Sequence, residues 1–201
     1  MTIRAWLNRW RRRWAHALWH RRVFGEQQGR HALPHTRIAP STCIDHEEGL
    51  LLADHVYIGP FNHLEASGGL VLEEGVQITS HCVLTTHSSH RALRLQGRAY
   101  ATHLEAEHGP RPGWVAGPIH VGAYSFIGPH SVLEAGTRLG RGTLVCAGSV
   151  VRGHFPDFAV LQGQPAVVVG DTRQADAELL RQHPQWQAHR QAWADTDAGR
   201  A

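Results

Sequence analysis

The hydrophobic residues of the C-terminal half repeat at a fixed interval of six positions. Aliphatic side chains occupy this interval at Val121, Ile127, Leu133, Leu139, Val145 and Val151. A period of six fits neither an α-helix nor a simple hairpin, but it fits short strands that are separated by tight corners. Three such units close one turn of a triangular parallel β coil, so residue n should stack on residue n+18. The aliphatic side chains would then fill the interior of the coil.

Small residues follow the same period. A hydroxyl residue stands four places after each of the first five aliphatic residues, at Ser125, Ser131, Thr137, Thr143 and Ser149. Glycine directly follows three of the aliphatic residues, at Gly122, Gly128 and Gly140. We expect these glycines to relieve corners that need a positive φ.

The same phase is present earlier in the chain. Aliphatic residues stand six apart in two sets, at Leu52, Ile58 and Leu64 and at Leu72, Ile78 and Leu84. An eight-residue step separates the two sets, and the extra residues around Gly68 and Gly69 predict a bulged corner. The pattern then stops until Val121, which predicts a long extruded loop over residues 87–117.

The N-terminal end predicts a basic amphipathic helix that Thr2 can cap. Residues 1–22 contain seven Arg and no acidic residue, and an apolar stripe at helical spacing is formed by Trp6, Trp10, Trp14 and Leu18. We expect this stripe to pack on the protein's own body or on a neighbouring subunit, since Trp in such helices usually packs. Contact with an anionic membrane surface or with nucleic acid is the alternative.

The C-terminal end predicts two further helices. A polar helix begins near Ala175, and a second short helix after Pro184 carries Trp186 and Trp193. Together these patterns divide the chain into three parts: an N-terminal helical segment over 1–39, a β-helix domain over 40–172, and a helical tail over 173–201.

Composition narrows the chemistry that the chain can perform. The 201 residues include 20 basic residues, all of them Arg, and 17 His, with a net charge of +3. The absence of Lys excludes a Schiff base, a pyridoxal phosphate linkage and a P-loop lysine.

The three cysteines lack the spacing of a disulfide framework or a zinc site and are expected to be small buried residues. With neither a membrane-spanning stretch nor a secretory signal in view, a cytoplasmic location is expected.

Three short segments resemble a known enzyme family. These are Gly163-Gln164-Pro165-Ala166, Ala147-Gly148-Ser149-Val150-Val151 and Phe126-Ile127-Gly128-Pro129-His130. With the hexads, they resemble the left-handed parallel β-helix acyltransferases of the hexapeptide-repeat family. That group includes galactoside and maltose acetyltransferases and the O-acetyltransferases of bacterial surface polysaccharides. The resemblance covers about residues 40–172 and implies a homotrimer with acetyl-CoA between adjacent prisms and no metal.

The resemblance also implies a catalytic histidine where the repeat breaks into the loop. Acetyl transfer to a hydroxyl needs a base that accepts its proton, and a positioned His contributes about 10² to 10⁴-fold. His87 matches the family's Thr-x-His arrangement and is favoured, whereas His90 begins a stretch that also resembles family sequences. Glu65 lies about one coil below, where the galactoside enzymes have an acceptor-contacting amide. Glu65 would orient the His or bind a sugar hydroxyl, or would be an exposed carboxylate of the coil.

For the cosubstrate, the resemblance implies backbone contacts from Ala147 and Gly148, packing from Phe126, and contributions from Gly163 and Gln164. Two basic positions of the family are apolar or Gly here. Arg152 and Arg173 are candidates to replace them at the nucleotide phosphates, because the guanidinium group suits phosphate binding.

The sequence therefore predicts an acetyl-CoA-dependent O-acetyltransferase that acts on a sugar hydroxyl of a surface polysaccharide or its precursor. Two other functions stay open. A γ-type carbonic anhydrase shares the fold and holds zinc with three His, for which the sequence offers His81, His87, His90 and His130. The third function is a non-enzymatic trimeric scaffold with a membrane-binding basic helix. Such a helix would also suit an enzyme at the inner face of the membrane.

Overall fold

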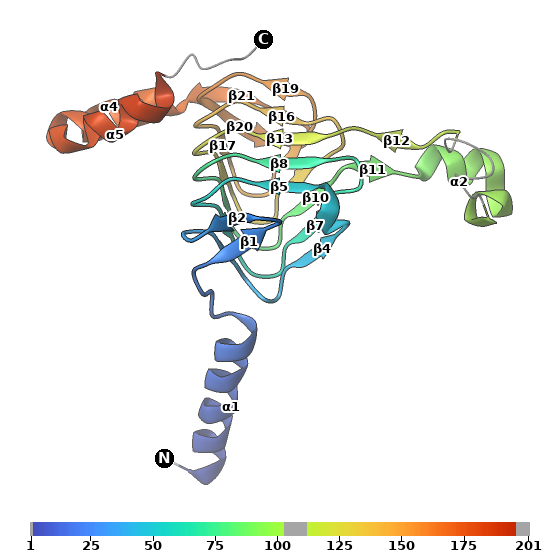
Figure 1. Cartoon of the computed structure of the whole chain (residues 1–201), viewed down its shortest axis with the longest axis horizontal. Helices are drawn as coiled ribbons and strands as arrows, with labels where there is room; N and C mark the ends of the chain where they lie inside the picture. Colours follow the sequence, from blue (N-terminus) through green and yellow to red (C-terminus); the bar gives the residue numbers. More distant parts are fainter. Residues whose placement is uncertain (1, 103–111, 196–201) are drawn as a thin grey trace.

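The chain folds as a triangular coil of short parallel strands from which three appendages project, as a computed structural model shows (Figure 1). The structure describes residues 2–102 and 112–195. Parts of the predicted loop (103–111) and tail (196–201) lie outside the described residues.

Three sheets form the faces of the prism, and all but one of their strands pair in parallel. The first face contains β3 (Arg37–Ile38), β6 (Tyr57–Ile58), β9 (Gln77–Ile78), β14 (Phe126–Ile127), β17 (Leu144–Val145), β20 (Ala159–Gly163) and, at one edge, β21 (Ala166–Asp171), which pairs antiparallel with β20. The second face contains β4 (Cys43–Asp45), β7 (His63–Glu65), β10 (Val83–Thr85), β15 (Val132–Leu133) and β18 (Val150–Val151). The third face contains β5 (Leu50–Leu52), β8 (Leu70–Leu72), β13 (Ile119–Val121), β16 (Arg138–Leu139) and β19 (His154–Phe155). Each turn of the chain visits the three faces in this order, which confirms the predicted β-helix.

The strand registers agree with the predicted stacking. Val121 pairs with Leu139, Ile127 with Val145 and Leu133 with Val151. The two earlier sets of aliphatic residues stack on each other in the same way, as Leu64 on Leu84 shows. Nearly all of these side chains are fully buried, and they form one continuous hydrophobic cluster along the coil axis. Apolar burial of this kind is the main stabilising contribution to folding.

The Ser and Thr residues that recur every six positions form hydrogen bonds at the corners of the coil. Ser125, Thr137 and Thr143 are buried, and each hydroxyl donates to a backbone carbonyl at a corner, at Gly140 for Ser125 and Thr143 and at Glu134 for Thr137. The Ser125 hydroxyl, for example, lies 3.0 Å from the Gly140 carbonyl oxygen of the next coil. These bonds satisfy carbonyl groups that the tight turns leave without a strand partner.

The glycines that follow the aliphatic residues do not have the expected conformation. Gly122, Gly128 and Gly140 are absent from the residues with positive φ, which instead stand two places later, at Tyr124, His130 and Gly142. A Cβ atom on Gly128 would lie 2.7 Å from the Ala147 nitrogen of the next coil. Glycine is therefore needed at these positions for close packing between coils, and the prediction of a positive φ there was wrong.

A stem carries the excursion out of the second-to-third corner. β11 (His87–Ser88) pairs antiparallel with β12 (Val115–Ala116), and the Gly117 N–H donates to the Thr86 carbonyl at 3.0 Å. Beyond the stem, the predicted loop contains α2 (His90–Gln96) and the short helix η2 (Gly97–Thr102). The excursion and the C-terminal helices lie on opposite sides of the coil (Figure 1).

The two ends of the chain form the other appendages. α1 (Ile3–Trp19) has Thr2 as its N-cap, as predicted, and is followed by the hairpin β1 (Glu26–Gln28) and β2 (His31–Leu33). This hairpin and β3 lie within the segment that was expected to be helical. Between β4 and β5 lies the short helix η1 (Glu47–Gly49). At the other end, α4 (Thr172–Gln182), η3 (Pro184–Trp186) and α5 (Gln187–Ala194) follow the β20–β21 hairpin.

Candidate active site

A buried carboxylate and a histidine meet where the excursion leaves the coil. Glu65 ends β7, and His87 begins β11 one coil further on. The His87 Nδ1 atom lies 2.8 Å from Glu65 Oε2 and 3.1 Å from the Ser67 hydroxyl oxygen. The bulged corner around Gly68 brings Ser67 under His87, which the eight-residue step in the sequence indicated only as an irregularity.

Glu65 points out of the prism but is covered. Its exposed fraction is 5%, so the interpretation of Glu65 as an exposed carboxylate is wrong. Its Oε1 accepts from the Ser67 N–H at 2.8 Å, and its Oε2 accepts from the Thr86 N–H at 3.0 Å and the Thr86 hydroxyl at 2.7 Å. Every contact is with a donor, which suits an ionised carboxylate.

The balance of these contacts sets the pKa of Glu65. Burial alone would raise the pKa of this carboxyl, but the hydrogen bonds from Ser67, Thr86 and His87 outweigh burial and lower it to about 2. Because the charged form is stabilised, Glu65 can hold the His87 Nδ1–H by accepting its hydrogen bond.

This lowered pKa predicts a change in stability at acid pH. A carboxyl with a depressed pKa contributes stability above its unfolded value of 4.5 and loses it as the pH falls toward 2. Glu65→Gln should therefore flatten the decrease in unfolding free energy between these two values, by on the order of 3 kcal/mol in total. Urea denaturation at several pH values measures the difference. Glu178→Gln, an exposed carboxylate on α4, controls for the loss of one charge, and parallel curves for all three proteins would contradict the prediction.

The other ring nitrogen of His87, Nε2, is available to exchange a proton. Within the described part of the chain, no hydrogen bond is found to His87 Nε2, and the side chain is 25% exposed. The ring stacks on Trp114 of the returning arm of the excursion, with ring centroids 4.3 Å apart and an angle of 12°. A histidine held at Nδ1, fixed by stacking and open at Nε2 has the geometry of a general base.

His90 lies outside this arrangement. It is exposed at the first turn of α2, and its Nδ1 atom is 2.7 Å from the Ser88 hydroxyl. The structure thus joins His87 with Glu65 and leaves His90 apart from them. Sequence reasoning missed Ser67, Thr86 and Trp114, of which only Thr86 had a signal, through its position before His87.

Four of the residues predicted for the cosubstrate gather at another corner. Ala147 is exposed at the first-to-second corner, and the neighbouring Gly148 has a φ of +73° with open space at its Cβ position. The Gln164 side-chain amide donates to the Gly148 carbonyl at 2.6 Å, and the Gly163 N–H reaches the Ser149 hydroxyl at 3.3 Å. This corner presents exposed backbone and small residues to a ligand.

The remaining three residues are more scattered. Phe126 lies on β14 of the first face and is 39% exposed. Arg152 is exposed at the second-to-third corner, 4.0 Å from a carboxylate oxygen of Glu134. Arg173 is paired with Asp171 at 2.5 Å and covers the Phe158 ring. The structure therefore does not bring the two Arg side chains together.

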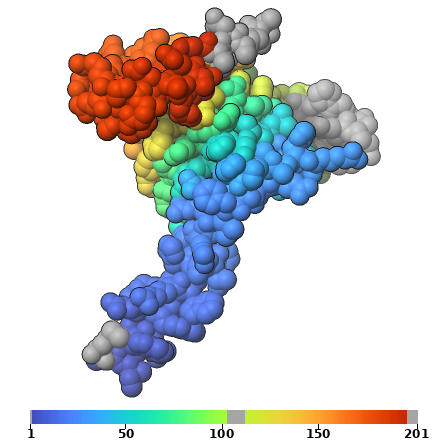
Figure 2. Space-filling view, turned by 60° about the vertical axis from the view of Figure 1, so that its left-hand side comes forward, coloured from blue at the N-terminus to red at the C-terminus, as the bar shows by residue number. Residues whose placement is uncertain are grey.

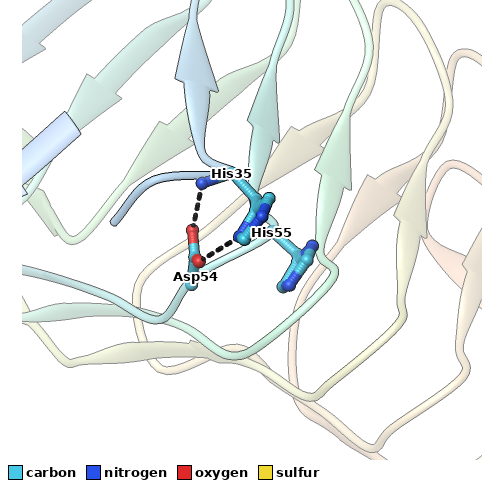
Figure 3. A group of neighbouring side chains, drawn as sticks. All are labelled: His35, Asp54 and His55. Atoms are coloured by element: carbon cyan, nitrogen blue, oxygen red, sulfur yellow. Dashed lines mark hydrogen bonds and ion pairs between the residues drawn. The ribbon is translucent and has the colours of Figure 1, made fainter. Parts of the chain in front are cut away.

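Among the described residues, two groups of three possible metal ligands occur: His35, Asp54 and His55, and Cys43, Asp45 and His63. In the first group, Asp54 accepts from the His35 N–H and ring, and His55 stacks on His35 with parallel rings 4.4 Å apart (Figure 3). Parallel rings direct their nitrogen lone pairs side by side, which does not suit one tetrahedral ion. In the second group Cys43 is exposed, which corrects the expectation that all three cysteines are buried.

The histidines offered for a carbonic anhydrase site have other roles in the described chain. The rings of His81 and His130 stack 5.0 Å apart in a corner column with Phe61, and both residues have a positive φ. His87 is held by Glu65 and Ser67. These contacts are those of packing and positioning.

Comparison with solved structures agrees with the coil geometry. One similar structure is a hexapeptide-repeat acetyltransferase of Vibrio cholerae complexed with acetyl coenzyme A, with a TM-score of 0.56 at 20% identity over 68% of this chain and 67% of that one. Another is the N-acyltransferase AntD of Bacillus cereus in complex with dTDP and coenzyme A, with a TM-score of 0.53 at 17% identity over 75% of this chain and 88% of that one. The chain has the hexapeptide-repeat acyltransferase fold.

Curated proteins that are similar in sequence cover only part of the chain or match it over only part of their own length. A Staphylococcus aureus (strain COL) protein named "Putative acetyltransferase SACOL2570" is 36% identical over 80 residues, which is 39% of each chain. The bifunctional protein GlmU of Streptococcus equi subsp. zooepidemicus is 31% identical over 150 residues, 68% of this chain and 31% of that protein. The alignments thus span about two fifths or less of these relatives' lengths. No family model matches the chain.

Proposed function

We propose that the protein transfers an acetyl group from acetyl-CoA to a sugar hydroxyl, with His87 as the general base. The Glu65–His87 pair supports this proposal most strongly. Glu65 holds the Nδ1 atom of His87 and leaves Nε2 open where the long excursion begins. A bacterial surface polysaccharide or its precursor is the proposed acceptor. The acetyl-CoA complex of the Vibrio cholerae structure supports the donor.

In the proposed step, His87 Nε2 removes the proton of the acceptor hydroxyl as its oxygen attacks the thioester carbonyl carbon. The carbon–sulfur bond then breaks, and the leaving CoA thiolate receives this proton from the His87 imidazolium, so that the products are an acetyl ester, free CoA and a neutral His87. Glu65 accepts the hydrogen bond of the Nδ1–H and stabilises the imidazolium that forms during attack. The rigid coil holds both side chains and limits their reorientation.

The proposed site combines two copies of the chain. Glu65 and His87 belong to the second-to-third corner, whereas Ala147, Gly148, Gly163 and Gln164 gather at the first-to-second corner. Two corners of one prism face different directions, so a homotrimer would bring one corner of each kind together. A long excursion then serves as a wall of the site shared between neighbours.

The decisive experiment titrates the full chain with acetyl-CoA by calorimetry and then follows thiol release with sugar acceptors. Binding at about one site per chain and thiol release that depends on the sugar support the proposal. No binding, with bound zinc found by metal analysis, would instead favour the carbonic anhydrase function. No binding without zinc would favour the scaffold.

The acceptor atom needs a separate test because the AntD structure is titled as an N-acyltransferase. Two sugars that differ only by a hydroxyl or an amino group at one carbon provide it. Alkaline hydroxylamine cleaves acetyl esters far faster than acetamides, so the stability of the product identifies the acylated atom. Transfer to the amino sugar alone would contradict O-acetylation while leaving acyl transfer intact.

A further inference from the structure

α1 carries an apolar face that stays open to solvent. None of its residues is buried, and Ile3, Trp10 and Trp14 are half or more exposed. In the space-filling view the helix stands away from the coil (Figure 2). The predicted packing of its Trp stripe on the protein's own body is therefore not observed.

Most apolar residues of α1 lie on one side of the helix. At 100° per residue, the large apolar side chains other than Trp19 fall within an arc of about 120°. This arc contains Ile3, Trp6, Leu7, Trp10, Trp14, Ala17 and Leu18. Trp19, the last residue of α1, lies on the opposite side, near Arg12. Arg11 and Arg13 border the arc on its two sides, and Arg9 and Arg12 lie on the opposite face. This is the distribution of a helix that lies in the plane of a membrane interface.

The positive charge of residues 1–22 favours an anionic partner. The seven Arg residues of this segment precede the first acidic residue, Glu26, so the segment contains no carboxylate to neutralise them. The positive charge continues into a pocket of about 450 Å³ at the base of α1, whose lining includes Arg21, Arg22 and Arg37. Guanidinium groups bind phosphate oxygens by paired hydrogen bonds, which favours a surface rich in phosphate.

A second copy of α1 is a poorer partner for the apolar face. Arg11 and Arg13 border that face, so a bundle of identical helices would bring like charges together at the positions that normally form interhelical ion pairs. No acidic residue of the segment could compensate. Three Trp side chains within the arc also suit the boundary between acyl chains and headgroups, where Trp is enriched.

We propose that α1 is an in-plane anchor for an anionic phospholipid bilayer. Its Trp-rich face enters the boundary of the acyl chains, and its Arg side chains contact lipid phosphates. No helix in the described part of the chain is long and apolar enough to cross a membrane, so the contact is with one leaflet. The His20 ring against Phe61 at 5.1 Å and the Arg22 guanidinium over the Tyr57 ring at 5.1 Å join the anchor to a corner of the coil and to its first face.

The test is co-sedimentation of the full chain with sucrose-loaded vesicles. One set contains phosphatidylcholine alone, and in the other phosphatidylglycerol replaces part of it. We expect binding to the second set only, and weaker binding as salt is added, because salt screens the attraction between Arg and lipid. Equal binding to both sets, or no binding to either, would overturn the proposal.

Paired variants locate the contact on the two faces of α1. Arg11→Gln with Arg13→Gln, at the two borders of the apolar arc, should weaken binding about thirtyfold, since each basic residue near an anionic surface contributes about 1 kcal/mol. Trp10→Ala with Trp14→Ala should weaken binding at least tenfold through the loss of inserted apolar surface. Matched controls are Arg91→Gln with Arg94→Gln on α2, and Trp186→Ala in η3, because these side chains are also exposed. Controls that weaken binding as much as the α1 variants would contradict an anchor at α1.

Two further measurements distinguish a membrane from other possible partners of α1. If the Trp variants change the mass of the protein in solution and leave vesicle binding intact, a second copy covers the apolar face and the proposal fails. If the chain binds DNA in the same buffer but not the anionic vesicles, the partner is nucleic acid and the proposal also fails. Circular dichroism of each variant checks that the coil and α1 are folded.

Discussion

His87→Ala should lower kcat for acetyl transfer by about 10² to 10⁴-fold, which is the range that a positioned general base contributes. The reason is geometric: Nδ1 is held by Glu65 and Ser67, the ring is stacked on Trp114, and Nε2 has no hydrogen bond within the described part of the chain. Acetyl-CoA affinity should be nearly unchanged because the predicted donor contacts are made by other residues, on the first-to-second corner of a neighbouring copy. Steady-state thiol release and calorimetry measure the two quantities.

His90→Ala is the matched control for this prediction. His90 is three residues away, exposed on α2 and bonded to Ser88, so its removal should change kcat little. A large loss with His90→Ala and near-normal turnover with His87→Ala would transfer the role of the base to His90. Near-normal turnover in both variants would end the general-base mechanism.

Glu65→Gln should lower kcat by on the order of 10²-fold, the loss that a small misplacement of a catalytic group can cause. The amide is close in size to the carboxylate, but it cannot provide the negative charge that stabilises the imidazolium. Its NH2 group would also oppose either the Ser67 N–H, which now binds Oε1, or the Thr86 N–H and hydroxyl, which now bind Oε2. The KM for acetyl-CoA should stay constant while kcat falls.

Glu65→Asp separates this positioning role from a structural one. The shorter carboxylate keeps its charge and should restore part of the lost kcat, although its reach to His87 is reduced. Melting curves of both variants provide the control. If Glu65→Gln and Glu65→Asp lose equal activity in proportion to a loss of folded protein, Glu65 acts on stability and not on His87.

The coil could be predicted from the sequence because each hexad places one aliphatic side chain inside, and repetition makes the phase visible. Leu133 and Val151 stack as their spacing requires. The β1–β2 hairpin and α2 could not be predicted in this way, since short elements carry too few periods to establish a pattern. The role of Gly128 also depends on the next coil, whose approach its neighbours in sequence do not reveal.

The candidate site could be predicted only in part. The break in the repeat marked His87, and the coil spacing placed Glu65 nearby. The burial of Glu65 results from Ser67 and Thr86, which close over it from two different coils. Trp114 reaches His87 across the whole excursion, so its contact depends on the stem pairing and has no local signal.

The stem of the excursion has a consequence for how such proteins can diversify. Thr86 and Gly117 are hydrogen-bonded neighbours, so the coil continues from β10 to β13 as if the intervening residues were a short corner. The entropy of closing a loop grows only slowly with its length, and here the stem fixes both ends. The segment between Ser88 and Trp114 can therefore be lengthened, shortened or exchanged between related chains at little cost to folding, whereas Trp114 itself stacks on His87. Acceptor preference could then evolve separately from the stability of the scaffold that holds the catalytic pair.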